Sequence, residues 1–351
     1  MSKSDVAEIQ PNAIGQSVLR TEDPTLLIGR GEYIADMVLP GMLHAVFVRS
    51  PFAHAKINRI TVAAAAALPG VKLVWTGADI KGHCEGLLGA LDIPNFVPTL
   101  QPLIADDEVR YVGEAVAVIV AANRRMAEDA AELVDVDYDE LPIVANLVQA
   151  RTADNLANDQ VPGNVIHHAS RIADKLDEAF ASAAVVEQGE FHNNRISAAP
   201  METRGCVARH EWTSGLLTFW SSTQMPGLFR TLLAATLQIP EHTIEIRVPH
   251  VGGGFGQKAH LFPEELAVCI LSSDIDKPVS WIEDRQENLL SAGHAKDQIN
   301  NMAIAVDGDG RVLAIKNRST TDSGAYNNIP WTAAIESTAG TASVTGAYKI
   351  P

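Results

Sequence analysis

The chain has 351 residues, of which 46% are hydrophobic and 20% charged, a composition typical of a globular protein with an ordinary buried core. Asp and Glu outnumber Lys and Arg by 43 to 27, and the net charge of −16 argues against a surface for nucleic acid or anionic lipid. The three cysteines are too few and too scattered for a disulfide framework or a metal cage, so we expect buried, reduced thiols.

The first 20 residues are polar and show no periodicity, so we expect an extended arm there. This arm lacks the apolar segment of a secretory signal, and no apolar stretch of the chain is long enough to cross a bilayer. These features predict a cytoplasmic protein without a membrane span.

Regular structure is expected to begin with a strand at residues 43–48. Thr61 is a suitable N-cap for a short Ala-rich helix at 62–68, and a second strand follows at 71–75. Residues 77–107 are rich in Gly, Pro and Asp, which predicts loops over the surface.

A strand buried on both faces is predicted at residues 112–121, because they are nearly all Ala and Val. Asn123 is a suitable N-cap for the next helix, expected at 124–133. The side chains expected on one apolar face of this helix are Met126, Ala130 and Leu133. In the strand expected at 134–139, three aspartates alternate with apolar residues, which favours a solvated carboxylate face over a metal site.

The second half of the chain mixes strands and helices after a polar connection expected at residues 151–168. In this connection His167 and His168 point apart on an extended chain, so we expect them to be solvated. The strands are predicted at 216–221, 243–248 and 279–283, the helices at 228–237 and 264–272, and a β-hairpin at 299–306 and 312–318. Glu264 and Glu265 lie in the first turn of the second helix, where negative charge complements the helix dipole. Because strands and helices do not alternate regularly, we expect an α+β fold.

The most informative local sequence is the glycine-rich segment Val248–Lys258, VPHVGGGFGQK. Its glycines permit a left-handed backbone and leave main-chain N–H groups free to bind an anion. The segment lacks the Lys-Ser/Thr pair of a Walker A loop, and Gln257 stands where the dinucleotide fingerprint requires its last glycine. From these residues alone, an anion-binding loop and a tight turn between two strands are equally compatible.

Five segments, taken together and in order, resemble the molybdopterin-binding subunit of the xanthine dehydrogenase, aldehyde oxidase and carbon monoxide dehydrogenase family. They are Gly29–Ile57, Tyr111–Pro142, PMETRG at Pro200–Gly205, SSTQ at Ser221–Gln224 and the glycine-rich segment. The resemblance implies an α/β hammerhead domain of the aldehyde oxidase and xanthine dehydrogenase type at residues 21–150. It then implies the connection at 151–168 and the first part of a molybdopterin-binding domain at 169–351.

The resemblance also implies a cofactor and the residues that hold it. Members of the family bind molybdenum through a pterin dithiolene, without a direct protein ligand to the metal, and water supplies the oxygen for hydroxylation. By similarity, Gly253, Gly254, Phe255 and Gly256 would contact the cofactor, and the Gln224 amide would donate a hydrogen bond to an oxo group. The cofactor would be a molybdopterin dinucleotide, in its cytosine form if the protein is bacterial.

Two departures from the family pattern bear on the reaction. Many purine-hydroxylating members carry a glutamate after the lysine of the glycine loop, whereas Ala259 follows Lys258 here and would leave that wall of the substrate pocket apolar. The resemblance covers about the first half of such a subunit. We therefore expect the general-base glutamate to lie beyond residue 351.

The activity implied by the resemblance is that of a molybdenum hydroxylase acting on a small aldehyde, an N-heterocycle or carbon monoxide. Electrons would pass to a [2Fe–2S] small subunit and an FAD medium subunit, with the three chains assembled as a dimer of heterotrimers. The alternative is a non-catalytic fragment, or one half of a split subunit, that supplies only cofactor contacts and an interface.

Overall fold

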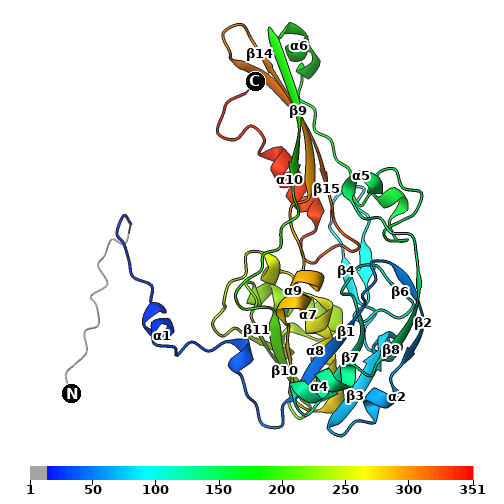
Figure 1. Ribbon diagram of the computed structural model, residues 1–351. Coiled ribbons are helices and arrows are strands. Elements are labelled where there is room, and N and C mark those ends of the chain that lie inside the picture. Colours follow the sequence, from blue (N-terminus) through cyan, green and yellow to red (C-terminus); the bar gives the residue numbers. More distant parts are fainter. Residues whose placement is uncertain (1–13, 351) are drawn as a thin grey trace, which may run out of the picture.

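The computed structural model describes residues 14–350. Residues 14–20 of the expected arm contain no helix or strand, and the rest of that arm lies outside the described residues. The short helix α1 (Asp23–Leu27) has no buried residue and stands away from the rest of the molecule (Figure 1). The chain joins the main body at the 3-10 helix η1 (Ile34–Asp36), where Ile34 is buried.

A seven-stranded mixed sheet forms the centre of the main body, in the order β12-β11-β10-β13-β1-β7-β3. In the same order, these strands are Ile244–Arg247, Leu216–Ser221, Gly205–Glu211, Val279–Ile282, Leu43–Arg49, Ala115–Ala121 and Val71–Thr76. β1 pairs in parallel with β13, with Leu43 opposite Val279. One sheet therefore contains strands from both halves of the sequence.

Both faces of this sheet are buried, and successive side chains of the central strands point to opposite faces. Phe47 of β1 lies in the large core together with side chains of helix α8 (Pro263–Ile275), whereas Val46 packs with those of α4 (Arg124–Ala131). All seven residues of β7 are buried, which confirms the two-sided strand predicted from its Ala and Val content. Helix α7 (Pro226–Leu237) packs beside β12.

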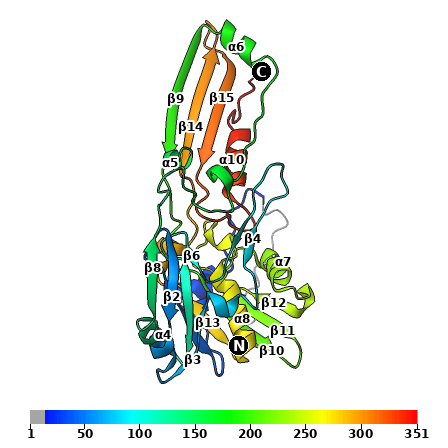
Figure 2. The same ribbon diagram turned by 90° about the vertical axis from the view of Figure 1, so that its right-hand side faces the viewer.

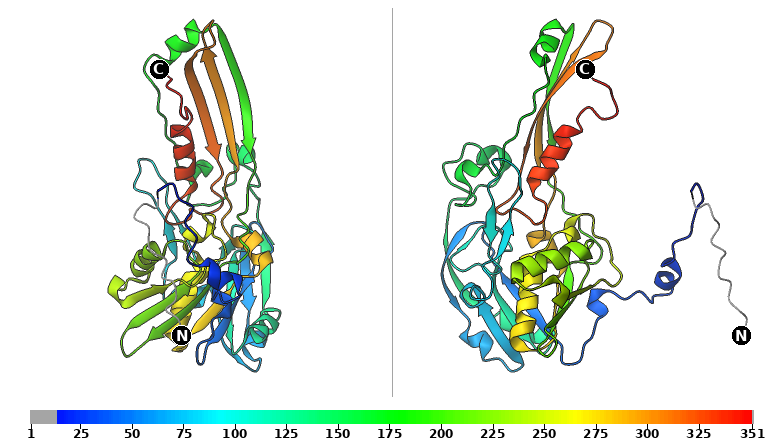
Figure 3. Two further views of the ribbon diagram at one scale, coloured as in Figure 1. Left: turned by 90° about the vertical axis from the view of Figure 1, so that its left-hand side faces the viewer. Right: turned by 180° about the vertical axis from the view of Figure 1, so that it is seen from behind.

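Three smaller sheets surround this core or extend from it. They are β6-β2-β8 (Glu108–Val109, Ala55–Thr61 and Asp135–Glu140), β4-β5 (Leu87–Gly89 and Thr99–Gln101) and β15-β14-β9 (Val312–Thr321, Gln298–Val306 and Val185–Asn193). The last of these projects from the main body, with α6 (Leu176–Ser182) and α10 (Ala333–Ala342) packed against β15 (Figures 2 and 3). The remaining helical elements are α2 (Ala63–Ala66), α3 (Gly77–Ile80), α5 (Leu147–Ala150), η2 (Pro162–Asn164), η3 (Glu241–Thr243), η4 (Gln257–Ala259) and α9 (Arg285–Ser291).

Several predictions of local structure are confirmed along with the α+β class. The Asn123 side chain accepts a hydrogen bond from the Met126 N–H at 3.0 Å and caps α4. The aspartates of β8 are exposed, as expected for a solvated strand face. All three cysteines are free, and Cys206 and Cys269 are buried. Among the described residues, no helix combines the length and the apolar character that crossing a membrane requires.

Other predictions of local structure are wrong. Thr61 does not cap α2, because the helix begins one residue later and its N-cap is Val62, which makes no side-chain cap bond. On α4 the buried residues are Ala127 and Ala130, while Leu133 lies beyond the end of the helix and is 43% exposed. The segment expected to be loops contains α3 and the β4-β5 hairpin, because its Gly and Pro residues separate very short elements. Besides β4 and β5, the strands missed entirely are β2, β6, β9 and β10.

Candidate functional site

The glycine loop, Gly252–Gly256, follows β12 and leads into η4 and α8. Gly253 and Gly256 have φ angles of 96° and 90°, values that side chains with a Cβ rarely adopt. Phe255 also lies in the left-handed region, at φ 52°, and its side chain is 75% exposed. A large aromatic residue held in this conformation and directed outward is an unusual arrangement that clusters at functional sites.

Close packing explains why two further loop positions are glycine. A Cβ added to Gly254 would lie 2.5 Å from Cγ, Cδ and Oε1 of Gln224. A Cβ added to Gly252 would lie 2.5 Å from Cβ of Glu202. The loop therefore fits against these two side chains only because its main chain carries no substituent there.

The loop presents main-chain donors that have no partner in the protein. Within the described part of the chain, the N–H groups of Gly253, Gly254 and Phe255 form no hydrogen bond. The N–H of Gly256 donates to Oε1 of Gln224 at 2.9 Å, and that of Gln257 donates to the Gly254 carbonyl at 3.0 Å. Three consecutive free donors suit an oxygen-rich or anionic ligand.

Gln224 is brought to the loop by the end of β11. Its N–H donates to the Lys258 carbonyl at 3.0 Å, and the same carbonyl accepts a bond from Oγ1 of Thr223 at 3.0 Å. With Oε1 occupied by Gly256, the side-chain NH₂ of Gln224 is exposed and bonds to no other described residue. The structure thus brings together the two sequence motifs SSTQ and GGGFG, and leaves an amide donor free beside them.

A buried ion pair beneath the loop was missed by the sequence reasoning. Nζ of Lys258 donates to Oε2 of Glu202 at 2.8 Å, and the Lys258 side chain is 2% exposed. The same oxygen accepts the N–H of Gly252 at 2.8 Å. Burial lowers the pKa of Lys258, against the opposing effect of Glu202. The PMETRG motif was the only sequence signal, and it did not reveal that Glu202 pairs with Lys258.

Further buried charges support the loop from the core side. The Arg204 guanidinium lies between Glu283 and Glu264, and donates to Oε1 of Glu283 and Oε2 of Glu264. Burial alone would raise the pKa of Glu264, but the nearby guanidinium groups outweigh it and hold that pKa below its usual value. Asn288 connects this network to the loop, donating to Oε2 of Glu283 at 2.7 Å and to Oε1 of Gln257 at 3.1 Å.

Glu264 and Glu265 do occupy the first turn of α8, but both are buried rather than solvated. Oε1 of Glu265 accepts a bond from Ser221 at 3.1 Å, and Oε2 accepts the N–H of Phe262 at 3.2 Å. Burial raises the pKa of Glu265 to about 7. The helix dipole accounts for the position of these two residues but not for their burial.

The chain turns into a short helix directly after the glycine loop. Residues Gln257–Ala259 form the 3-10 helix η4, because the Ala259 N–H bonds back to the Gly256 carbonyl at 3.1 Å. Ala259 is 6% exposed. Its proposed place in the wall of a substrate pocket stays a prediction.

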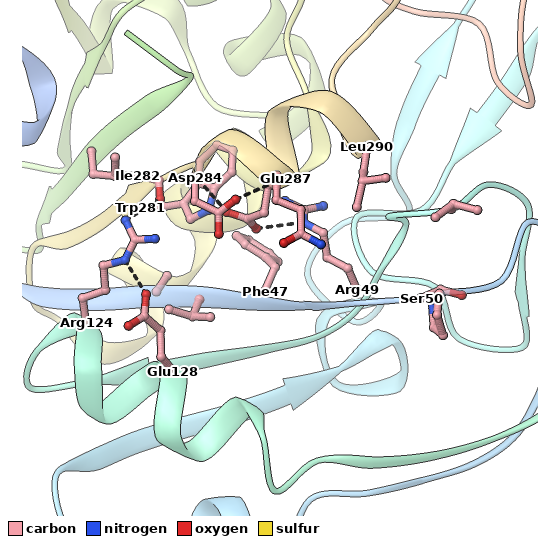
Figure 4. A pocket seen from close by; sticks show the side chains of 15 residues that line it. Phe47, Arg49, Ser50, Arg124, Glu128, Trp281, Ile282, Asp284, Glu287 and Leu290 are labelled. Atoms are coloured by element: carbon pink, nitrogen blue, oxygen red, sulfur yellow. Dashed lines mark hydrogen bonds and ion pairs between the residues drawn. The ribbon is translucent and has the colours of Figure 1, made fainter. Parts of the chain in front are cut away.

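A cleft of about 480 Å³ lies elsewhere, between β1, α4 and α9 (Figure 4). Arg124 pairs there with Glu128, and Arg49 pairs with Glu287 (Figure 4). No residue of the glycine loop is among the described residues that line it. Its charged side chains largely satisfy one another, so the chemistry of the glycine loop is the stronger candidate.

Comparison with known proteins identifies the family to which the chain belongs. Residues 157–351 match the family described as the molybdopterin cofactor-binding domain, and residues 28–142 match the α/β hammerhead domain of aldehyde oxidase and xanthine dehydrogenase. The chain belongs to this family of molybdopterin-binding subunits. It is 44% identical over 345 residues to the nicotine 6-hydroxylase large subunit of Paenarthrobacter nicotinovorans, covering 98% of this chain and 42% of that relative.

Other relatives in the molybdopterin-binding family support the same assignment. The carbon monoxide dehydrogenase large chain of Afipia carboxidovorans is 36% identical over 322 residues, covering 88% of this chain and 39% of that relative. The crystal structure of quinoline 2-oxidoreductase from Pseudomonas putida 86 superimposes with a TM-score of 0.94 at 56% identity, covering 97% of this chain and 44% of that chain. The chain thus spans less than half the length of these relatives.

The residues present fit a molybdopterin. The free N–H groups of the loop match the oxygen and nitrogen acceptors of a pterin with its phosphate. Among the described residues, no group of three or more His, Cys, Asp or Glu side chains could hold a metal ion directly. The donors of the loop suit a metal that is held by an organic cofactor rather than by protein side chains.

Proposed function

We propose that this chain is the cofactor-binding part of a molybdenum hydroxylase that hydroxylates an N-heteroaromatic ring. The observation that carries the proposal is the contact between Gln224 and the glycine loop, with three free N–H groups and a free amide at one place. When bound, the molybdenum pterin supplies the oxidising centre for a hydroxylation whose oxygen comes from water.

Each residue of the site has a specific role in this proposal. The N–H groups of Gly253, Gly254 and Phe255 bind acceptor atoms of the cofactor, and Gly256 orients Gln224 by donating to its Oε1. The Gln224 NH₂, left free by this bond, would donate a hydrogen bond to an acceptor atom of the bound cofactor. The exposed ring of Phe255 would pack against the bound cofactor and help to exclude water from it.

The choice of an N-heteroaromatic substrate rests on similarity and on one residue. Identity is 56% to a quinoline oxidoreductase and 44% to a nicotine hydroxylase large subunit, against 36% to a carbon monoxide dehydrogenase large chain. The methyl group of Ala259 offers no hydrogen bond to a purine, which supports a substrate with fewer ring heteroatoms than xanthine.

The finer features of the assembly also belong to this proposal. The cofactor is the cytosine dinucleotide form if the protein is bacterial, and electrons leave through a [2Fe–2S] small subunit and an FAD medium subunit in a dimer of heterotrimers. The hammerhead domain occupies residues 21–150, the connection 151–168, and the first part of the molybdopterin-binding domain 169–351. The general base is a glutamate outside residues 1–351.

The test is an assay of the purified holoenzyme on quinoline, a pyridine, an aromatic aldehyde, xanthine and carbon monoxide, together with its molybdenum and nucleotide content. We expect stoichiometric molybdenum, a cytosine nucleotide after hydrolysis, and the highest kcat/KM on an N-heteroaromatic compound. A holoenzyme without molybdenum would refute the cofactor assignment. Xanthine or carbon monoxide as the best substrate would refute the substrate class.

A further inference from the structure

The two sides of the glycine loop meet at a single carboxylate. Oε2 of Glu202 accepts the N–H of Gly252 at 2.8 Å, where the loop begins, and Nζ of Lys258 at 2.8 Å, just after the loop ends. The Glu202 N–H also donates to the Gly252 carbonyl at 3.1 Å. One side chain therefore fixes the distance between the ends of the loop.

Lys258 transmits this constraint to Gln224. While its ammonium group binds Glu202, its carbonyl oxygen accepts hydrogen bonds from the N–H of Gln224 and from Oγ1 of Thr223, both at 3.0 Å. Oε1 of Gln224 in turn accepts the N–H of Gly256. A displacement of Lys258 would therefore move the main chain of Gln224. It would also move the glycine loop, because Gly256 of the loop is bonded to the Gln224 side chain.

Glu202 is itself anchored independently of the loop. The Arg285 guanidinium donates to the carbonyls of Pro200 and Met201, the two residues before it. On the other side, Oγ1 of Thr203 donates to the Glu283 carbonyl at 2.5 Å. The carboxylate is therefore presented from a fixed segment, while the loop carries few hydrogen bonds of its own.

A buried ion pair of this kind is weak evidence for stability, because desolvation offsets most of the attraction between the charges. Such a pair can instead fix the relative position of the segments that it joins, since an ammonium group buried against one carboxylate has one favourable position. From these contacts we infer that Glu202 and Lys258 are positioning residues, an ionic clamp that holds the glycine loop and Gln224 in the geometry that the cofactor requires. This inference rests on the proposed function and deepens it.

Two substituted proteins and their combination test the clamp in the complete enzyme. Glu202→Gln and Lys258→Met each leave one buried group without its partner, so both variants are expected to lose stability as well as activity. The double variant Glu202→Gln/Lys258→Met removes both charges at nearly constant volume, and is expected to recover the melting temperature. The matched control is Glu245→Gln, which breaks an exposed pair with Arg247 on β12, the strand that leads into the loop.

The double variant separates positioning from stability. We expect hydrogen exchange in the peptide spanning residues 250–258 to be at least tenfold faster than in the wild type. We also expect kcat per bound molybdenum to fall at least tenfold, with KM within twofold of the wild type. The control is expected to match the wild type in every measurement.

Wild-type exchange at 250–258 in the double variant, or wild-type kcat per molybdenum, would overturn the clamp and leave the pair a purely structural contact. The exchange measurement does not require the cofactor. If the wild-type enzyme proved to hold no molybdenum, the proposed function would fail, and the exchange result alone would still decide for or against the clamp.

Discussion

Glu265 is a buried carboxyl group that should make the stability of the protein depend on pH, and Glu265→Gln removes that dependence. The side chain is 4% exposed and accepts hydrogen bonds from Ser221 and from the Phe262 N–H. Burial raises its pKa to about 7 from an ordinary value of 4.5, although Arg204 opposes the rise. A glutamine can replace both bonds, since its NH₂ donates to Oγ of Ser221 and its oxygen accepts from Phe262.

The size and sign of the effect follow from proton linkage. The native state binds the proton more tightly than the unfolded chain, so the free energy of unfolding falls as pH rises from about 4.5 to about 7. Below this window both states are protonated, and above it the native state holds a buried charge. The difference between pKa values of 4.5 and about 7 corresponds to about 3 kcal/mol as an upper bound. At pH 8 the Glu265→Gln protein should therefore be more stable than the wild type by up to about 3 kcal/mol.

Urea unfolding followed by tryptophan fluorescence from pH 5 to 8.5 provides the measurement. Glu114, whose pKa burial also raises to about 7, contributes equally to both proteins and cancels in the difference. Glu187→Gln, at an exposed position on β9, is the control and should follow the wild-type curve. Parallel curves for the wild type and Glu265→Gln over the whole range would show that Glu265 is not protonated in the native state.

Three further substitutions test the glycine loop itself. Gly254→Ala places a Cβ 2.5 Å from Gln224 and should lower bound molybdenum at least severalfold, whereas Gly227→Ala, with no atom within 4 Å, should retain wild-type metal content. Gln224→Ala should leave the melting temperature unchanged and lower kcat by roughly 10²- to 10³-fold, as loss of one transition-state donor does; wild-type kcat with full molybdenum would contradict its role. Phe255→Ala should change the free energy of unfolding by less than about 0.5 kcal/mol, because the 75% exposed ring leaves no cavity, and a loss of several kcal/mol would show that the ring is packed.

Elements whose burial imposes a residue pattern were predictable from the sequence. β7 was predictable because both of its faces are covered, which permits a nearly continuous Ala and Val run. β9 was missed for the opposite reason, since all nine of its residues are exposed and its sequence shows no alternation. β10 carries Arg209 and His210 directly after its apolar residues, so neither strand periodicity nor a buried run was visible.

The candidate site was predictable only through its motifs. The glycine loop and Gln224 were singled out from sequence, and the structure places them in contact. The pairing of Glu202 with Lys258 depends on residues 56 positions apart, and Arg204 binds Glu264 and Glu283 across 60 and 79 positions. Such contacts are set by tertiary packing, and a single sequence carries no local signal for them.

The parallel pairing of β1 with β13 has a consequence for how the chain acquires its structure during synthesis. β1 is the fifth strand in the central sheet, yet one of its two neighbours, β13, begins only at Val279. Arg49 at the end of β1 likewise finds its partner Glu287 only 238 residues later. At ribosomal rates of about 5 to 20 residues per second, roughly 10 to 50 s pass between the synthesis of β1 and that of β13. During this time one edge of β1 is unpaired. The apolar face and the unpaired edge of β1 are therefore a binding target for chaperones. Variants in which β13 pairs with β1 more slowly should aggregate during folding even when the stability of the native state is unchanged.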